Sequence, residues 1–292
     1  MKIKFLLTLL LLLLVLVNQS GPLDVISRDY TKAGLQRALV TYAVARGLNG
    51  IISVAQGTEV AVEPAGIGLI FTPGQILDPV NDLIERFSWI VLVSGTSLGV
   101  QQFLLEISSW IWFRLAVTVI ALAAIFAIWP AYPGIIAIRS VLMRLVMIMI
   151  ILRFSVPLLA FGNEILYRHF LEPEYQASSE SLLRTSLTLN DLNSEPQVTA
   201  EAPEKEGQSI LEQARRIYQS TADNIKINAR IQAFKQAAEH ISEHTINLIV
   251  VFVLQTLLIP LVYLWAILQL LKYLFTAPLP PPVNIMNDKH FS

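Results

Sequence analysis

The stretch from Trp110 to Phe161 decides the fold that we expect for this chain. It begins Trp110-Ile111-Trp112-Phe113-Arg114 and continues as an apolar run to Trp129, the turn Pro130-Ala131-Tyr132-Pro133-Gly134, and a second apolar run to Phe161. Each run is long enough for the roughly 20 helical residues that cross the ~30 Å hydrocarbon core of a bilayer. We therefore predict a central transmembrane helical hairpin over residues 110–162.

The composition also indicates a membrane protein. The 292 residues are 54% hydrophobic and 15% charged, whereas a soluble domain is about 45–50% apolar and about 25% charged. The net charge of −1 disfavours a nucleic-acid partner, which would require a basic surface. The absence of cysteine excludes a disulfide framework, a thiolate nucleophile and a Cys-ligated metal. We predict an all-α integral membrane protein whose first partner is the lipid bilayer.

Residues 1–20 have the layout of a bacterial secretory signal. Lys2 and Lys4 precede a Leu/Val run that ends at Val17, and such a charged start followed by a short apolar core directs export. The sequence Asn18-Gln19-Ser20 is a poor cleavage site. A cleaved signal peptide and a retained signal anchor therefore both stay open, and either one places residue 21 outside the cytoplasm.

Residues 21–109 are predicted to form a helical region that lies outside the cytoplasm or along the membrane. Apolar residues at helical spacing predict an amphipathic helix over 29–47, a short strand is expected within 67–72, and Asp78-Pro79 is typical of a helix start. The segment 87–107 has the length of a span but carries glycines, hydroxyls, glutamines and an acid. It either crosses the membrane or packs at its surface, and a crossing would invert the orientation of everything downstream.

The C-terminal part divides into four segments by composition. Residues 163–207 are acidic and poor in aromatics, which predicts a flexible linker. The capping box Ser209-x-x-Glu212 starts an amphipathic helix over 208–246, through which we expect self-association or binding of a protein partner. This helix continues into a transmembrane helix over 247–275, where Pro260 is expected to introduce a kink. Residues 276–292 form a Pro-rich tail.

Arginines within the apolar runs are the candidate functional charges. Interfacial anchoring is the ordinary role of such side chains, and an ion path or an anion site is the functional alternative, because intramembrane charges are expensive. These arginines are Arg114, Arg139, Arg144 and Arg153.

The positions of these arginines favour one orientation. A cytoplasmic turn places Arg139 and Arg144 inside, as positively charged residues prefer. Arg114 and Arg153 then lie at the opposite face, with Glu106 and Glu164 as the expected partners. The alternative orientation makes 87–107 a span and places residues 163–245 in the cytoplasm.

One short motif has a possible catalytic meaning. His240-Ile241-Ser242-Glu243-His244 spells H-x-x-E-H, the pattern of inverted zinc-binding helices. Such a site requires a third ligand, usually an acid well downstream, and Asp288, beyond the last span, is the only acid that follows. A hydrated helix end above the membrane explains the same residues without any metal.

Taken together, these features predict a non-enzymatic, multi-pass protein of the bacterial inner membrane with no cofactor. Its expected role is structural: assembly, scaffolding or partner binding. The alternative is a subunit of an oligomeric channel or transporter that uses the arginines named above. A remote alternative is a zinc-dependent hydrolase that uses His240, Glu243 and His244.

Overall fold

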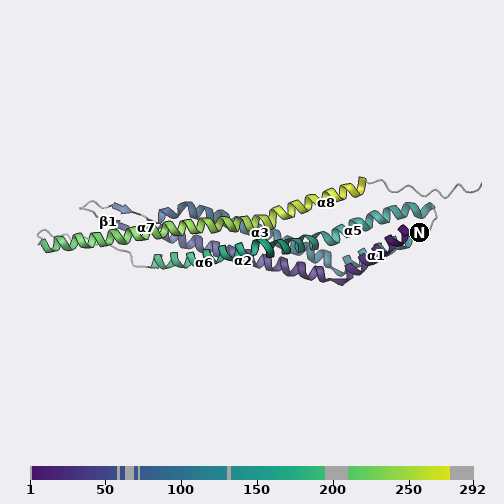
Figure 1. Ribbon diagram of the computed structural model, residues 1–292, viewed down its shortest axis with the longest axis horizontal. Coiled ribbons are helices and arrows are strands. Elements are labelled where there is room, and N and C mark those ends of the chain that lie inside the picture. Colours follow the sequence, from purple (N-terminus) through teal and green to yellow (C-terminus); the bar gives the residue numbers. More distant parts are fainter. Residues whose placement is uncertain are drawn as a thin grey trace, which may run out of the picture. The chain divides into compact units, whose positions relative to one another are not determined.

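The protein is built almost entirely from helices (Figure 1). The computed structural model describes residues 2–57, 60–62, 69–71, 73–129, 133–194 and 210–276. The elements in chain order are α1 (Lys2–Ser20), α2 (Pro22–Gln56), β1 (Val60–Val62), β2 (Leu69–Phe71), the 3₁₀ turn η2 (Pro73–Leu77), α3 (Asp78–Ser109), α4 (Ile111–Ile128), α5 (Pro133–Leu166), the π-helical turn η3 (Tyr167–Leu171), α6 (Glu172–Ser194), α7 (Ile210–Val253), the π-helical turn η4 (Leu254–Leu258) and α8 (Ile259–Thr276).

Five helical segments are long and apolar enough to cross a membrane. They are Pro22–Gln56, Gly74–Ser109, Ile111–Ile128, Ile138–Ser194 and Asn228–Tyr273. The N-terminal helix, Lys4–Ser20, is apolar but shorter. The predicted class, a helical multi-pass membrane protein, agrees with these lengths and compositions.

Several local predictions are confirmed. The helix expected over 29–47 lies within α2, α3 begins at Asp78, and the strand expected within 67–72 is β2. This strand pairs antiparallel with β1, so that Val60 lies opposite Phe71. The segment 87–107 belongs to one unbroken helix, α3, despite its two glycines.

Pro260 lies in a helical path that a π-helical turn interrupts just before the proline. Because proline has no N–H, the carbonyl of Thr256 cannot receive its usual helical hydrogen bond. The Ser97 hydroxyl donates to this carbonyl instead, at 3.3 Å. The Thr256 hydroxyl contacts the Ser94 hydroxyl at 2.9 Å. Side chains of a neighbouring helix thus satisfy the backbone groups that the proline releases, as membrane helices require.

The prediction of a flexible linker over 163–207 is wrong for residues 163–194. These residues complete α5 and form η3 and α6, while 195–207 lie outside the described residues. Leu182 and Leu189 of α6 are buried, and the small residues Ser178 and Ser186 are buried on the same face. These two leucines, seven residues apart and alternating with the two serines, give α6 a buried stripe that an average over the whole segment conceals.

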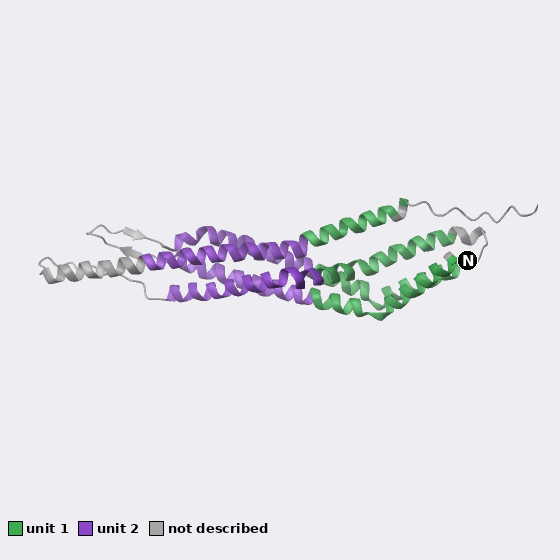
Figure 2. Ribbon diagram, in the orientation of Figure 1, with its two compact units in different colours: residues 1–31, 100–163, 258–292 green, residues 32–99, 164–257 purple. Residues whose placement is uncertain are grey.

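The chain divides into two compact units (Figure 2), residues 1–31, 100–163 and 258–292 in unit 1 and residues 32–99 and 164–257 in unit 2. In unit 1, Leu11 of α1, Ala124 and Ile128 of α4 and Val146 of α5 form an apolar cluster. Ala121 and Ala124 are fully buried on the inner face of α4. Small residues at such positions allow helix backbones to approach closely.

Unit 2 is a bundle of four helices around a continuous apolar core. Buried residues recur every three or four positions, which gives each helix one apolar face. α6 and α7 run side by side (Figure 1). The main members of the core are Ala45, Leu48 and Ile52 of α2, Ile84, Phe87 and Val91 of α3, Leu182 and Leu189 of α6, and Phe234, Ile241, Leu248 and Phe252 of α7.

Candidate functional site

Two helix interruptions frame a polar network in unit 1. α1 ends where Gly21 adopts a left-handed backbone conformation, with φ of +72°, which non-glycine residues reach only with strain. The Gly21 carbonyl then accepts a hydrogen bond from the Val25 N–H at 3.2 Å, so α2 begins at once. The second interruption is Trp110, whose extended backbone (φ −61°, ψ 140°) separates α3 from α4.

Arg114 caps the C-terminal end of α1. Its Nε donates to the Asn18 carbonyl at 3.0 Å, and its Nη2 donates to the Gln19 carbonyl at 2.5 Å. The last carbonyls of a helix have no partner within the helix and carry partial negative charge, so a guanidinium there is favourable. Arg114 therefore joins α4 to α1 through backbone groups, independently of any carboxylate.

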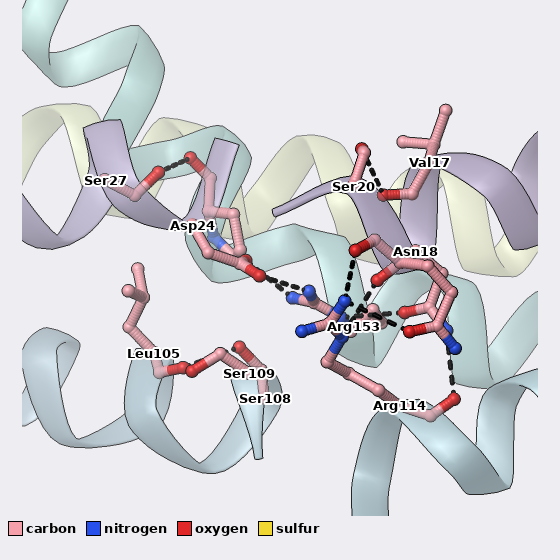
Figure 3. A network of polar contacts seen from close by, with 12 residues as sticks. Val17, Asn18, Ser20, Asp24, Ser27, Leu105, Ser108, Ser109, Arg114 and Arg153 are labelled. Atoms are coloured by element: carbon pink, nitrogen blue, oxygen red, sulfur yellow. Dashed lines mark hydrogen bonds and ion pairs between the residues drawn. The ribbon is translucent and has the colours of Figure 1, made fainter. Parts of the chain in front are cut away.

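Asn18 connects Arg114 to the interior of unit 1 (Figure 3). Its side chain is fully buried. Its Nδ2 donates to the Arg114 carbonyl at 2.9 Å and to Thr118 Oγ1 at 3.1 Å. Its Oδ1 accepts from Arg153 Nε at 3.0 Å. One amide side chain thus joins the end of α1 to both α4 and α5.

The centre of the network is an ion pair between Arg153 of α5 and Asp24 of α2. The Arg153 side chain is 1% exposed and that of Asp24 is 9% exposed. Arg153 Nη1 donates to Asp24 Oδ1 at 2.8 Å, and Nη2 donates to Oδ2 at 2.5 Å. Two parallel N–H···O bonds are the bidentate geometry that arginine and carboxylate prefer (Figure 3).

Pro157 lies one turn after Arg153 in α5. Because proline lacks an N–H, the carbonyl of Arg153 loses its normal helical partner. Ser27, one turn after Asp24 in α2, donates its hydroxyl to the Pro157 carbonyl at 2.9 Å. Two contacts a turn apart therefore hold α2 against α5, one ionic and one between a hydroxyl and the backbone.

This arrangement positions helices and neutralises a charge. Asp24 compensates the buried charge of Arg153, and each nitrogen of the Arg153 guanidinium donates to Asp24 or Asn18. Breaking a buried pair by removing one partner costs about 3–5 kcal/mol, since an uncompensated charge then stays inside. The network is thus suited to fixing one arrangement of α1, α2, α4 and α5.

The structure brings together two of the four arginines singled out from the sequence. Arg114 and Arg153 share Asn18 as a partner. Arg144 is exposed and Arg139 is half-buried, and neither forms an ion pair with any residue that the structure describes. At ~1.5 Å per residue, Arg144 lies about 13 Å and Arg139 about 21 Å along α5 from Arg153.

The expected acidic partners were wrong. Glu106 is exposed, and Glu164 pairs with Arg168 on its own helix. The actual partners, Asn18, Gln19 and Asp24, lie near the N-terminus. A signal for Asp24 was present, because it is the first acid in the chain and interrupts the apolar run Leu23-Asp24-Val25-Ile26. An arginine within an apolar run requires such a partner. No local sequence pattern, however, connects two residues that are 129 positions apart.

The H-x-x-E-H residues lie on α7 in unit 2. His240 and Glu243 are exposed and His244 is half-buried. The two imidazole rings stack in parallel, with centroids 6.4 Å apart, and His244 Nδ1 lies 3.3 Å from Ser178 Oγ. Within the described ranges, no group of three or more His, Asp or Glu side chains is arranged to hold a metal ion.

Comparison with known proteins gives this chain no relative. No protein family matches it, and neither a curated protein nor a solved structure similar to it was found.

Proposed function

We propose that this chain is a non-enzymatic, multi-pass protein of the bacterial inner membrane that serves as a structural, assembly or partner-binding component. The observation that carries the proposal is that the Arg153–Asp24 ion pair is buried away from solvent. A charge that serves an ion path must be open to ions or water, whereas the Arg153 side chain is 1% exposed and each of its guanidinium nitrogens donates to Asp24 or Asn18. A charge held in this way fixes helices in place.

Unit 2 supplies the surface on which a partner would bind. The apolar faces of α2, α3, α6 and α7 pack together in its core. Exposed polar side chains cover the outward faces of α6 and the adjacent part of α7. These include Glu180, Arg184, Lys235 and Glu239. Because the face of α7 from Phe234 to Phe252 already packs within the chain, a partner would use the outward polar face of unit 2.

The proposed topology has four passages across the membrane. Antiparallel helices are joined by loops of about 2–5 residues, so the single residue Trp110 between α3 and α4 is too short for a reversal. α3 and α4 then belong to one passage, as do α1 and α2 around Gly21. α5 forms the third passage and α7 with α8 the fourth, so that α4 and α5 are the arms of the central hairpin and α1 is a retained anchor.

Positive charge assigns the sides of this topology. Four passages place the N-terminus, the connection between α4 and α5, and the C-terminus on one side. Lys2, Lys4, Arg139, Arg144 and Lys272 all belong to that side, which the positive-inside tendency makes cytoplasmic. α6 and the polar part of α7 then face the periplasm.

A photo-crosslinking experiment in cells tests the scaffold role. A crosslinking residue at Glu180 or Lys235 is expected to yield discrete adducts with another protein, because both side chains point outward. Leu189 is fully buried and is the matched control, which is expected to give no adduct. Absence of adducts at the two outward positions would contradict a partner on this face.

A channel subunit is the second candidate, and Arg139 favours it, since this half-buried charge forms no ion pair with a described residue. Ion flux through liposomes that contain the purified protein separates the two roles. Flux above that of empty liposomes, reduced by Arg139→Gln, would replace the scaffold by the channel. The scaffold proposal expects no such flux.

A further inference from the structure

The outward faces of α2, α3 and α7 in unit 2 change from polar to apolar along their length, and the turn η3 before α6 carries one exposed apolar side chain. On one side of the change, exposed side chains are mostly polar or charged, such as Arg46 of α2, Arg86 of α3, Glu174 of α6 and Glu243 of α7. On the other side lies a group of exposed apolar side chains that we name the apolar collar. Its members are Leu39 and Val40 of α2, Trp89, Leu92 and Val93 of α3, Phe170 of η3, and Ile246 and Val250 of α7.

The collar side chains point away from the core of unit 2. Their exposed fractions range from 40% for Leu92 to 72% for Phe170. Those of α2, α3 and α7 lie between buried residues of the same helix, as Val250 does between Leu248 and Phe252. The collar is therefore an outer surface and contributes little to the internal packing of the bundle.

Contacts between α2 and α3 show that their changes occur at the same level. The Asn49 side chain donates to that of Asn81 at 2.9 Å on the polar side. On the apolar side, a Cβ built on Gly95 would lie 3.3 Å from the Ala38 side chain. Between these two contacts, the last exposed charges before the collar begins are Arg46 on α2 and Arg86 on α3.

The same level continues onto α6 and α7. Tyr175 of α6 contacts Thr41 of α2, with 3.0 Å between their hydroxyl oxygens, and its ring meets that of Phe252 of α7 at 6.2 Å between centroids. His244 and Ser178 contact each other at 3.3 Å on the polar side. Three helices, α2, α3 and α7, thus exchange polar for apolar exposure within about one helical turn of a common level. At that level η3, which precedes α6, contributes Phe170 beside the exposed Arg168 and His169.

We propose that the apolar collar lies in lipid and that this common level is where unit 2 leaves the hydrocarbon of the bilayer. A binding site for another protein would occupy one side of the bundle, whereas α2, α3, α7 and the turn η3 before α6 all contribute to the collar. Lipid is the partner that meets every side of a helical bundle at one depth. Trp89 is the first collar residue after Arg86, at the level where tryptophan is enriched in membrane proteins.

The inference rests on the proposed membrane insertion and adds its depth. It places Arg46, Arg86 and Glu243 in water and Val40, Trp89 and Val250 in lipid. It also places part of α3 within 87–107 inside the hydrocarbon, as one section of the α3–α4 passage. The polar ends of the four helices then project from the membrane together as one bundle.

The absence of native cysteine permits a clean test with single spin labels. Cysteine is introduced at Val40, Trp89 or Val250, labelled with a nitroxide, and reconstituted in liposomes of phosphatidylethanolamine and phosphatidylglycerol. Collision rates with oxygen, which enters lipid, and with a water-soluble nickel chelate are then compared. Val93 replaces Trp89 if the tryptophan variant does not fold.

Leu187 of α6 is the matched control, because it is an apolar residue with 59% exposure, equal to that of Val40, but lies on the polar side of the level. We expect an oxygen-to-nickel ratio several-fold higher at the collar positions than at Leu187. A label at Leu122 of α4 reports on membrane insertion itself.

Three results would overturn the inference. A collar as accessible to nickel as Leu187, with Leu122 still in lipid, would refute the depth while membrane insertion stands; water access at Leu122 as well would refute both. Collar labels shielded from both reagents, with dipolar broadening between singly labelled copies, would show that a second copy of this chain covers the collar in place of lipid.

Discussion

Replacing Asp24 by asparagine is expected to be among the most destabilising near-isosteric changes in the described part of this protein. The substitution keeps the size of the side chain and removes its charge. Arg153 stays 1% exposed and loses its only carboxylate partner among the described residues. The buried guanidinium is then uncompensated, which is the costly way to disrupt an internal ion pair.

The size of the effect follows from the contacts that are lost. Two charge-assisted hydrogen bonds, at 2.8 and 2.5 Å, join Arg153 to Asp24, and each such bond contributes about 1.5–3 kcal/mol. The asparagine retains one neutral acceptor, and Asn18 still accepts from Arg153 Nε. We therefore expect the lower part of the range for broken buried pairs, about 3 kcal/mol.

The free energy of unfolding is measured by titrating the protein from mild detergent into a denaturing detergent. Glu180→Gln is the matched control, because Glu180 and Arg184 form an ion pair whose side chains are 64% and 76% exposed. Exposed pairs of this spacing contribute about 0.3–0.5 kcal/mol. The double variant Asp24→Leu with Arg153→Met removes both charges and is expected to recover most of the lost stability, since apolar replacements of buried pairs are often neutral.

Two results would refute this reasoning. An Asp24→Asn variant as stable as Glu180→Gln would mean that Arg153 is not held by Asp24. A double variant whose loss of stability equals the sum of the losses from Asp24→Leu alone and Arg153→Met alone would mean that the residues act independently, because residues in one network show a coupling energy.

Gly74→Ala is expected to lower the free energy of unfolding by on the order of 3 kcal/mol, because its Cβ would overlap the backbone carbonyl oxygen of Ala55 in α2. Gly21→Ala, which meets no atom within 4 Å but has φ of +72°, should cost only about 1–2 kcal/mol, and a reversed order in the same titration would contradict both. A reporter that works only in the cytoplasm should be active when fused at Asn284, and a tag within 190–205 should be accessible from the periplasm. The opposite pattern would invert the proposed topology. Replacing both His240 and His244 by alanine should change the free energy of unfolding by no more than about 0.5 kcal/mol. Stoichiometric zinc that survives dialysis of the native protein and is lost from the variant would contradict this expectation.

The sequence by itself determined the features that depend on neighbouring residues. Apolar runs of about 20 residues specify membrane-length helices, because the bilayer fixes that length. Helical spacing revealed the helix over 29–47, and Asp78-Pro79 revealed the start of α3, since both signals lie within a few residues of what they predict. The unusual arginines were also visible, as charges in an apolar setting.

Only the tertiary structure decided which partners those charges have. Asp24 and Arg153 are separated by 129 residues, and no local pattern encodes a contact between two helices so far apart in the chain. The average composition of residues 163–207 did not indicate α6. The two buried leucines of this helix stabilise it only where neighbouring helices cover them. The common level of the collar is likewise a property of packed helices. α2, α3 and α7 each change from polar to apolar exposure, but only their packing in one bundle aligns these changes into one boundary.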